Sequence, residues 1–281
     1  MFPIRDHNPS DRTPFVTYAL IALNALIFLS YYPALSSDGR ALSAFYTTWG
    51  LVPVDLFRAG EFQTLVTSQF LHGGWMHLAG NMLFLWIFGD NLEDLMGHLG
   101  FLVFYLASGI AAAMGQYAAD PFSSIPMVGA SGAIAGVMGG YLLIFPRARI
   151  DILVIIVIIF KVFTVPAWVM LGLWFGLQVF SGVGADAAGG GVAYWAHAGG
   201  FIAGAILAFP LWMRIGGPEY WKKTHGHPPH EDAEYENIGA SRIPRVKRRR
   251  TSAPPPAPDL SRVPASGRRR GSRNPWSGRR D

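Results

Sequence analysis

The sequence predicts an all-α membrane protein: a bundle of six transmembrane helices followed by a disordered basic tail. Three observations support this fold class. Hydrophobic residues make up 51% of the 281 residues and charged residues only 15%, whereas an ordinary soluble domain has about 25% charged residues. The charges are concentrated at the C-terminal end, and six apolar segments come close to the ~20 residues that a membrane helix needs.

The charge distribution divides the chain into three expected parts. Residues 1–213 carry 7 Lys and Arg against 11 Asp and Glu, whereas residues 214–281 carry 16 against 7. We therefore expect a cytoplasmic N-terminus at 1–13, a membrane domain at 14–213 and a cytoplasmic tail at 214–281. The chain has no cysteine, which excludes disulfides, thiolate metal ligands and cysteine nucleophiles.

Six apolar segments are the expected spans, and the second reaches full length only if it continues through residues 89–94. The run at 150–160, IDILVIIVIIF, is β-branched and too short to span, so we expect an extended or interfacial lead-in to the fifth helix. A signal peptide is the alternative for the first span, but that segment is long and weakly basic at its start. The spans are Phe15–Tyr31, Trp75–Phe88, Phe101–Tyr117, Met127–Phe145, Phe163–Phe180 and Val192–Met213.

Positively charged residues predict the orientation of these spans. Arg147 and Arg149 lie in the 4–5 loop and the Arg-rich tail follows span six, whereas the 3–4 and 5–6 loops contain no Lys or Arg. Only Arg40 and Arg58, in the long 1–2 loop, oppose the positive-inside rule. We therefore expect both termini in the cytoplasm of a multi-pass protein in the bacterial cell (inner) membrane.

The tail is rich in Pro, Ser and Arg and has almost no residues that could form a core. This composition is typical of a disordered segment. A solubilising, topology-fixing role is the first interpretation, and contact with anionic lipid headgroups is the alternative. No nucleic-acid partner is expected.

Four polar residues are expected at one depth of the bundle, near the outer boundary. His77 and Asn81 are four residues apart in span two and share a helix face. Ser131 lies about one turn inside span four, and His197 lies between one and two turns inside span six. At ~1.5 Å per residue, all four lie roughly 5–10 Å below the boundary. Polar groups inside a bilayer are costly and usually mark function.

Taken singly, each of these residues has a structural explanation. Ser131 fits helix packing, Asn81 fits an interhelical hydrogen bond, His77 fits an interfacial anchor, and His197 fits a bond to a carbonyl in the bundle. Two other classes of site are also open. A metal site would use His72 with His77 and His197, but the spacing lacks an H-E-x-x-H arrangement. A transporter site would favour the midplane and paired repeats.

The shared depth favours a serine nucleophile. A hydroxyl needs a base to take its proton, and His197 can be that base for Ser131. The backbone N–H of Ser131 and the side chains of His77 and Asn81 could then stabilise the oxyanion. Gly129 and Gly132 would let a substrate backbone approach the serine, and no aspartate is placed to orient the histidine, so the arrangement is a dyad. No cofactor and no metal are expected.

Regularly spaced glycines predict which two helices bring Ser131 and His197 together. Span four has glycines at 132, 136 and 140, and span six has glycines at 200 and 204. Small residues at this spacing allow close helix contact. We therefore expect spans four and six to lie against each other.

Three motifs together resemble the rhomboid family of intramembrane serine proteases. They are LHGGWMHLAGN within Leu71–Gly97, GASGAIAG at Gly129–Gly136 and AYWAHAGGFIAG at Ala193–Gly204. The resemblance covers about residues 14–213 and leaves the tail outside. It implies cleavage of transmembrane protein substrates in the lipid bilayer, at or near the outer side.

The resemblance also implies a role for each matching residue. Ser131 would be the nucleophile and His197 the general base. His77, Asn81 and the Ser131 amide would form the oxyanion hole, and His72 would hold a structural loop position. Inactive family members that bind membrane proteins are the alternative, but these have usually lost the dyad, which this chain keeps.

The chain departs from the family pattern at two places. Many members carry a tyrosine four residues after the serine that stacks on the catalytic histidine, and here that position is Ala135. His197 must therefore be held in another way. Many members also carry Trp-Arg in the 1–2 loop, where this chain has Gln63 and Thr64, which weakens any carried-over account of that loop.

Overall fold

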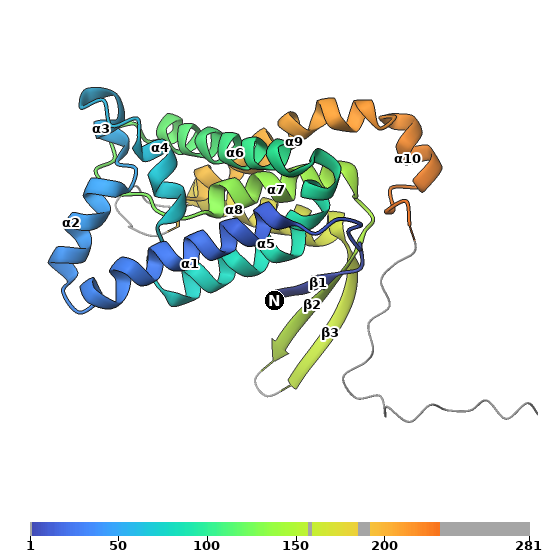
Figure 1. Cartoon of the computed structure of the whole chain (residues 1–281), viewed down its shortest axis with the longest axis horizontal. Helices are drawn as coiled ribbons and strands as arrows, with labels where there is room; N and C mark the ends of the chain where they lie inside the picture. Colours follow the sequence, from blue (N-terminus) through green and yellow to red (C-terminus); the bar gives the residue numbers. More distant parts are fainter. Residues whose placement is uncertain (1, 157–158, 185–191, 231–281) are drawn as a thin grey trace, which may run out of the picture. The chain divides into compact units, whose positions relative to one another are not determined.

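The computed structural model describes residues 2–156, 159–184 and 192–230, in which long helices form a bundle (Figure 1). Four of the described helices, α1, α6, α8 and α9, are long and apolar enough to cross a membrane, so the chain is an integral membrane protein. Six helices correspond to the six apolar segments: α1 (Phe15–Leu35), α5 (Trp75–Met96), α6 (His98–Ala119), α7 (Ser131–Ile144), α8 (Ala167–Gly184) and α9 (Tyr194–Arg214).

The other two of these helices, α5 and α7, differ from a simple apolar span. α5 has 22 residues, but its last two turns carry three acidic residues between Asp90 and Asp94. α7 has 14 residues, about 21 Å at 1.5 Å per residue, whereas a bilayer core is ~30 Å thick. α7 begins at Ser131 and not at Met127, because Met127 pairs with Leu51 in a short antiparallel bridge.

α7 lies inside the bundle, with most of its residues buried and α5, α6, α8 and α9 against it. The predicted close contact with α9 is confirmed. A Cβ atom at Gly200 would lie 2.2 Å from the carbonyl oxygen of Gly132, and one at Gly204 would lie 2.0 Å from that of Gly136. Both distances are far inside van der Waals contact, so the two backbones touch where the side chains are missing.

The expected all-α fold is wrong in one respect, because three strands form an antiparallel sheet in the order β1-β2-β3. They are β1 (Phe2–Asp6), β2 (Arg149–Ile156) and β3 (Ile159–Pro166). The β-branched run at 150–160 has a high strand propensity, and its expected extended conformation is confirmed at 150–156 and 159–160, the part that the structure describes. It does not lead straight into the fifth helix, however. β3 pairs back along β2 and the pair extends away from the helices (Figure 1), so α8 begins at Ala167 and not at Phe163.

Asp151 ties the three strands together. Arg5 Nε on β1 donates to Asp151 Oδ2 at 2.7 Å, and Thr164 Oγ1 on β3 donates to Asp151 Oδ1 at 2.5 Å. His7 Nε2 lies 3.0 Å from Asp151 Oδ1. Burial alone would raise the pKa of this carboxyl, but the hydrogen bonds from Thr164, Arg5 and His7 outweigh it and lower the pKa.

Asp6 attaches the sheet to α7. The Tyr141 hydroxyl, on α7, donates to Asp6 Oδ2 at 2.7 Å. Burial and the neighbouring Asp90 carboxylate raise the pKa of Asp6 to about 8. Asp6 therefore holds a proton at neutral pH, when an exposed aspartate would have lost it.

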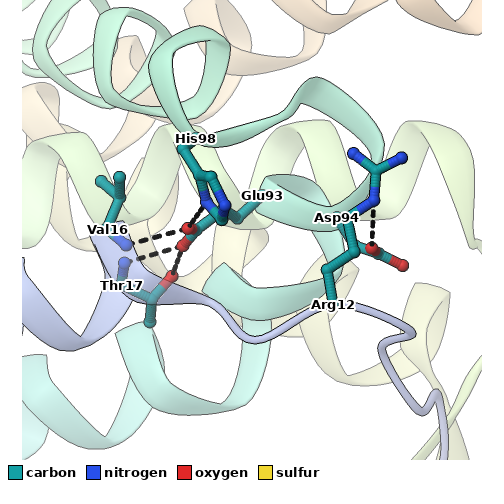
Figure 2. Close-up of polar contacts among 6 residues, drawn as sticks. All are labelled: Arg12, Val16, Thr17, Glu93, Asp94 and His98. Carbon is teal, nitrogen blue, oxygen red and sulfur yellow. Dashed lines mark hydrogen bonds and ion pairs between the residues drawn. The ribbon is translucent and has the colours of Figure 1, made fainter.

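Glu93, near the end of α5, caps the start of α1 (Figure 2). Its carboxylate accepts hydrogen bonds from the backbone N–H groups of Val16 and Thr17 at 2.8 and 2.7 Å, and from the Thr17 hydroxyl at 2.7 Å. His98 Nδ1 lies 2.6 Å from the same carboxylate. A buried carboxylate is stabilised here for two reasons. The first N–H groups of a helix have no intrahelical acceptor, and the N-terminus is the positive end of the helix dipole.

The folded part continues past residue 213, where the sequence predicts the tail to begin. Helix α10 (Pro218–Thr224) packs back on the bundle, because Trp221 Nε1 donates to the Leu143 carbonyl at 3.1 Å. The Trp221 and Trp212 rings lie 4.7 Å apart. The first part of the predicted tail is thus helical, the expected boundary at 213 and 214 stays a prediction, and residues 231–281 lie outside the described residues.

The 1–2 loop forms the end of the bundle opposite to α10 (Figure 1). It contains α2 (Gly39–Trp49), α3 (Pro53–Arg58), α4 (Thr64–Thr67) and the short 3-10 helix η1 (Ser68–Phe70). This loop supports the segment before α7. Leu51 and Met127 exchange two backbone hydrogen bonds of 2.9 and 2.7 Å, and Gly129 N–H donates to the Ser68 carbonyl at 2.9 Å.

Candidate active site

Ser131 and His197 lie in hydrogen-bonding contact at the end of the bundle that carries the 1–2 loop. Ser131 is the first residue of α7 and His197 is in the first turn of α9. The Ser131 Oγ atom lies 2.7 Å from His197 Nε2. The two residues are 66 positions apart in the chain, and the backbone contact between α7 and α9 brings them together.

Gly129 and His77 face each other beside Ser131. Gly129 has φ of 137°, in the left-handed region that favours glycine. A Cβ atom there would also lie 2.9 Å from His77 Nε2, so glycine is required on both grounds. The Gly73 N–H donates to His77 Nδ1 at 3.2 Å. Because Nδ1 accepts, a neutral His77 carries its proton on Nε2, the atom that faces Gly129.

Asn81 lies one turn after His77 on α5, as predicted, but its side chain is directed at its own helix. It is buried, and Asn81 Nδ2 donates to the His77 carbonyl at 3.0 Å. Asn81 is absent from the lining of the cavity that the described residues form around Ser131. The amide nitrogen has a second N–H, which the His77 contact leaves available.

His72 supports the loop behind His77. Its backbone N–H donates to the Tyr31 hydroxyl at 2.8 Å, and its carbonyl accepts from Tyr31 at 2.7 Å and from Tyr46 at 2.8 Å. The side chain is fully buried, with its ring edge-on to that of His77 at 5.2 Å. This placement fits the structural loop position expected from the motif.

Gly132 lines the cavity around Ser131 and also packs against a neighbouring helix. A Cβ atom at Gly132 would lie 2.6 Å from Ala112 Cβ on α6. Close packing is therefore one reason for glycine here, and the expectation that Gly132 admits a substrate backbone stays a prediction.

A cavity of about 760 Å³ reaches Ser131. Its lining includes Ser131, Gly129 and His77, together with Gln116 on α6 and Met127 on the segment before α7. Binding sites for small ligands commonly enclose about 300–1,000 Å³. The cavity is therefore large enough to bring a substrate segment to the serine hydroxyl.

Two residues on α8, neither of them predicted from the sequence, hold His197. Gln178 Oε1 lies 2.8 Å from His197 Nδ1. The Trp174 ring lies 5.7 Å from the imidazole, at an interplanar angle of 33°. One signal was available in the sequence: Gln178 is a lone strongly polar side chain in the apolar run 168–180, WVMLGLWFGLQVF, and such residues usually have a function.

The arrangement contains the parts of a nucleophile activated by a base. A hydroxyl contacts an imidazole, a third group contacts the other imidazole nitrogen, and a cavity opens on the hydroxyl. Among the described residues, no group of three His, Cys, Asp or Glu side chains is placed to hold a metal ion.

Comparison with known proteins gives matches across the helical bundle. Residues 59–214 match the family model described as Rhomboid domain. The chain is 35% identical over 206 residues to "Rhomboid protease GluP" of Bacillus subtilis (strain 168), an alignment that covers 70% of this chain and 36% of that protein.

Two eukaryotic relatives match at similar identity. "Rhomboid protein 1, mitochondrial" of Saccharomyces cerevisiae is 32% identical over 155 residues, which cover 52% of this chain and 41% of that protein. "RHOMBOID-like protein 4" of Arabidopsis thaliana is 32% identical over 197 residues, 68% of this chain and 45% of that protein. The matched part of the chain thus spans less than half the length of each of these three relatives.

Proposed function

Because this chain belongs to the rhomboid family, we propose that it is an active intramembrane serine endopeptidase. It would hydrolyse peptide bonds in or near transmembrane segments of other membrane proteins, with Ser131 as nucleophile and His197 as general base. The observation that carries this proposal is the 2.7 Å contact between Ser131 Oγ and His197 Nε2 beside a cavity that reaches Ser131.

The chemistry follows from that contact. As Ser131 Oγ attacks the carbonyl carbon of the scissile bond, His197 Nε2 takes the hydroxyl proton. The resulting imidazolium then gives this proton to the departing amine, leaving an acyl-enzyme. Water enters, gives a proton to His197 as it attacks the ester, and releases the new carboxyl terminus while the proton returns to Ser131 Oγ.

Three groups are proposed to stabilise the oxyanion. The Ser131 N–H is at the start of α7, where the first amides of a helix have no intrahelical acceptor. The His77 Nε2–H faces Gly129, and Asn81 has its second N–H for this purpose. One preorganised donor of this kind is worth ~3–4 kcal/mol of barrier.

We propose six membrane spans, with α5 and α7 crossing beside the four long apolar helices. Both termini would be cytoplasmic, because Arg147, Arg149 and the basic residues after α9 lie at the end of the bundle that carries α10. The active site would then open near the outer side of a bacterial cell membrane. The basic tail would fix this topology, and contact with anionic lipid headgroups is the alternative role.

The test is cleavage of a transmembrane reporter by the purified protein in detergent. Ser131→Ala and His197→Ala should each abolish cleavage with an unchanged thermal unfolding curve. Ser30→Ala is the matched control, because Ser30 is exposed on α1 and its hydroxyl donates to the Ile27 carbonyl of its own helix. A fluorophosphonate should label Ser131, and a chelator should leave the rate unchanged.

Two results would count against the proposal. Substantial cleavage by folded Ser131→Ala would remove the serine mechanism, and inhibition by a chelator would favour a metal site. A folded wild-type protein that binds the reporter but neither cleaves it nor reacts with the fluorophosphonate would instead be an inactive, substrate-binding family member.

A further inference from the structure

We propose that Gln178 is the positioning residue for His197, and that Trp174 supplies the aromatic wall that the family pattern places after the serine. This inference rests on the proposed function of Ser131 and His197. In this proposal, side chains of α8 determine the tautomer of His197 and the plane of its imidazole ring.

Both nitrogens of the His197 ring are in contact with a partner. Nε2 lies 2.7 Å from Ser131 Oγ and Nδ1 lies 2.8 Å from Gln178 Oε1. An amide oxygen can only accept a hydrogen bond, so Nδ1 must carry the proton. A neutral His197 then presents the lone pair of Nε2 to the serine hydroxyl, which is the tautomer that a general base needs.

The orientation of the Gln178 amide is supported from its other end. Gln178 Nε2 donates to the backbone carbonyl of Trp174, one turn earlier on α8, at 3.4 Å. With the amide turned over, two oxygens would face each other at the carbonyl and the NH₂ group would face Nδ1. The turned-over amide would therefore favour the wrong histidine tautomer and lose a hydrogen bond.

Trp174 restricts the plane of the imidazole. Its ring lies 5.7 Å from that of His197 and 6.2 Å from that of Phe201, one turn later on α9. The position that many relatives fill with tyrosine is Ala135, which is fully buried in α7. The aromatic contact therefore comes from α8 in this chain and not from α7.

The two residues stand out on a helix that otherwise presents much of its surface outward. Trp174 and Gln178 are four residues apart and share one face. Leu173 and Leu177, the residues just before them, are 54% and 52% exposed. One strip of α8 thus carries both contacts to the base, while neighbouring positions offer control substitutions.

A neutral amide differs from the carboxylate of a catalytic triad in one respect. Gln178 can fix the tautomer, but it brings no charge to stabilise the imidazolium that forms during proton transfer. Replacing Gln178 by glutamate should keep the hydrogen bond and add that charge. The acid limb of the kcat/KM profile, which reports ionisation of the base, should then move to higher pH.

The experiment compares Gln178→Leu, Gln178→Met and Gln178→Glu with Leu177→Ala, using reporter cleavage across a pH series and thermal unfolding in detergent. We expect Gln178→Leu and Gln178→Met to lower kcat at least about 10-fold with KM unchanged, because the wrong tautomer becomes accessible. Gln178→Glu should keep kcat within about threefold and shift the acid limb upward. Leu177→Ala should match the wild type in kcat, in KM, in the acid limb and in thermal unfolding.

Two outcomes overturn the inference while leaving the proposed function intact. One is an active wild type with kcat unchanged in Gln178→Leu and Gln178→Met. The other is an equal loss in all three Gln178 variants with no shift of the acid limb, which would make Gln178 a packing residue. A wild-type protein that neither cleaves the reporter nor reacts with a fluorophosphonate overturns the proposed function, and this inference with it.

Discussion

Helix α9 packs against α7 and against α8, and the two contacts differ in kind. Between α7 and α9 the backbones touch, with the position of a Cβ atom at Gly204 only 2.0 Å from the Gly136 carbonyl oxygen. Between α8 and α9 large rings intervene, and Phe175 stacks on Phe201 at 4.8 Å. On α8, a Cβ atom at Gly172 or Gly176 would meet nothing within 4 Å.

The difference separates two requirements of the proposed dyad. The distance between Ser131 and His197 depends on a backbone contact that has no side-chain freedom. The tautomer and plane of His197 depend instead on Gln178 and Trp174, whose side chains have rotatable bonds. We therefore expect changes at the α7–α9 contact to affect folding, and changes at the α8–α9 contact to affect turnover.

The largest effect should come from Gly204→Ala. The added methyl group would overlap the Gly136 backbone, and neither helix backbone can move aside cheaply. Overpacking of a well-packed core costs about 1–3 kcal/mol and occasionally more, and we expect the upper end of that range together with loss of cleavage. Unfolding in a denaturing detergent titration measures the stability. Wild-type stability in this variant would mean that the two helices are not in backbone contact.

Trp174→Ala should have the next largest effect, and its distinguishing result is a lower cleavage rate. Removal of the ring frees the plane of the imidazole, and we expect kcat to fall about 10-fold, a fraction of the usual contribution of a general base. Trp168→Ala is the control, because Trp168 is on the same helix and 57% exposed. Equal losses in the two variants would show that Trp174 has no specific effect on His197 and that loss of any large ring from α8 lowers the rate.

A smaller, pH-dependent effect should come from Asp6, which holds the far end of α7 through Tyr141. Its pKa is raised to about 8 in the folded chain, so the folded state keeps a proton that the unfolded state releases above pH ~4. The contribution of Asp6 to stability is therefore greatest at low pH and declines as pH rises from about 4 to about 8.

The measurement is the free energy of unfolding from about pH 5 to about pH 9, a range that brackets the raised pKa of Asp6. Asp6→Asn should remove this component of the slope, since the amide does not titrate. An unchanged slope in Asp6→Asn would show that Asp6 titrates like an exposed carboxyl.

The smallest effect should come from Gly176→Ala, the same substitution as Gly204→Ala on the other helix. The methyl group meets no neighbour, and alanine favours a helix by up to ~1 kcal/mol over glycine. We expect slightly higher stability and an unchanged cleavage rate. A marked loss here would show that α8 packs more closely than its open glycines indicate.

The parts of the candidate site that depend on backbone periodicity could be predicted from the sequence. Depth along a helix follows from residue number, so Ser131, His197 and His77 could be placed at one level before the fold was known. The glycine rows predicted which helices meet, because a missing side chain is visible in the sequence. The Leu51–Met127 bridge, which sets the start of α7, has no such signal.

The parts of the site that could not be predicted depend on the direction in which a long side chain points. Gln178 is visible as a polar residue in an apolar run, but nothing in the run gives its partner. Asn81 was placed on the correct helix face, yet its amide bonds to its own helix. The strand β1 has five residues, FPIRD, without an apolar alternation, and it is stabilised by a partner far away in the chain.

That separation has a consequence for the order in which the molecule is made. His7 and Asp151, which bond to each other across the sheet, are 144 residues apart. At a synthesis rate of about 5–20 residues per second, the ribosome needs roughly 7–30 s to travel from one to the other. During that time the ribosome synthesises α1, α5, α6 and α7, and β1 has no β2 to pair with. The N-terminal segment is then an open strand edge that another chain can pair with, until β2 emerges and closes the sheet.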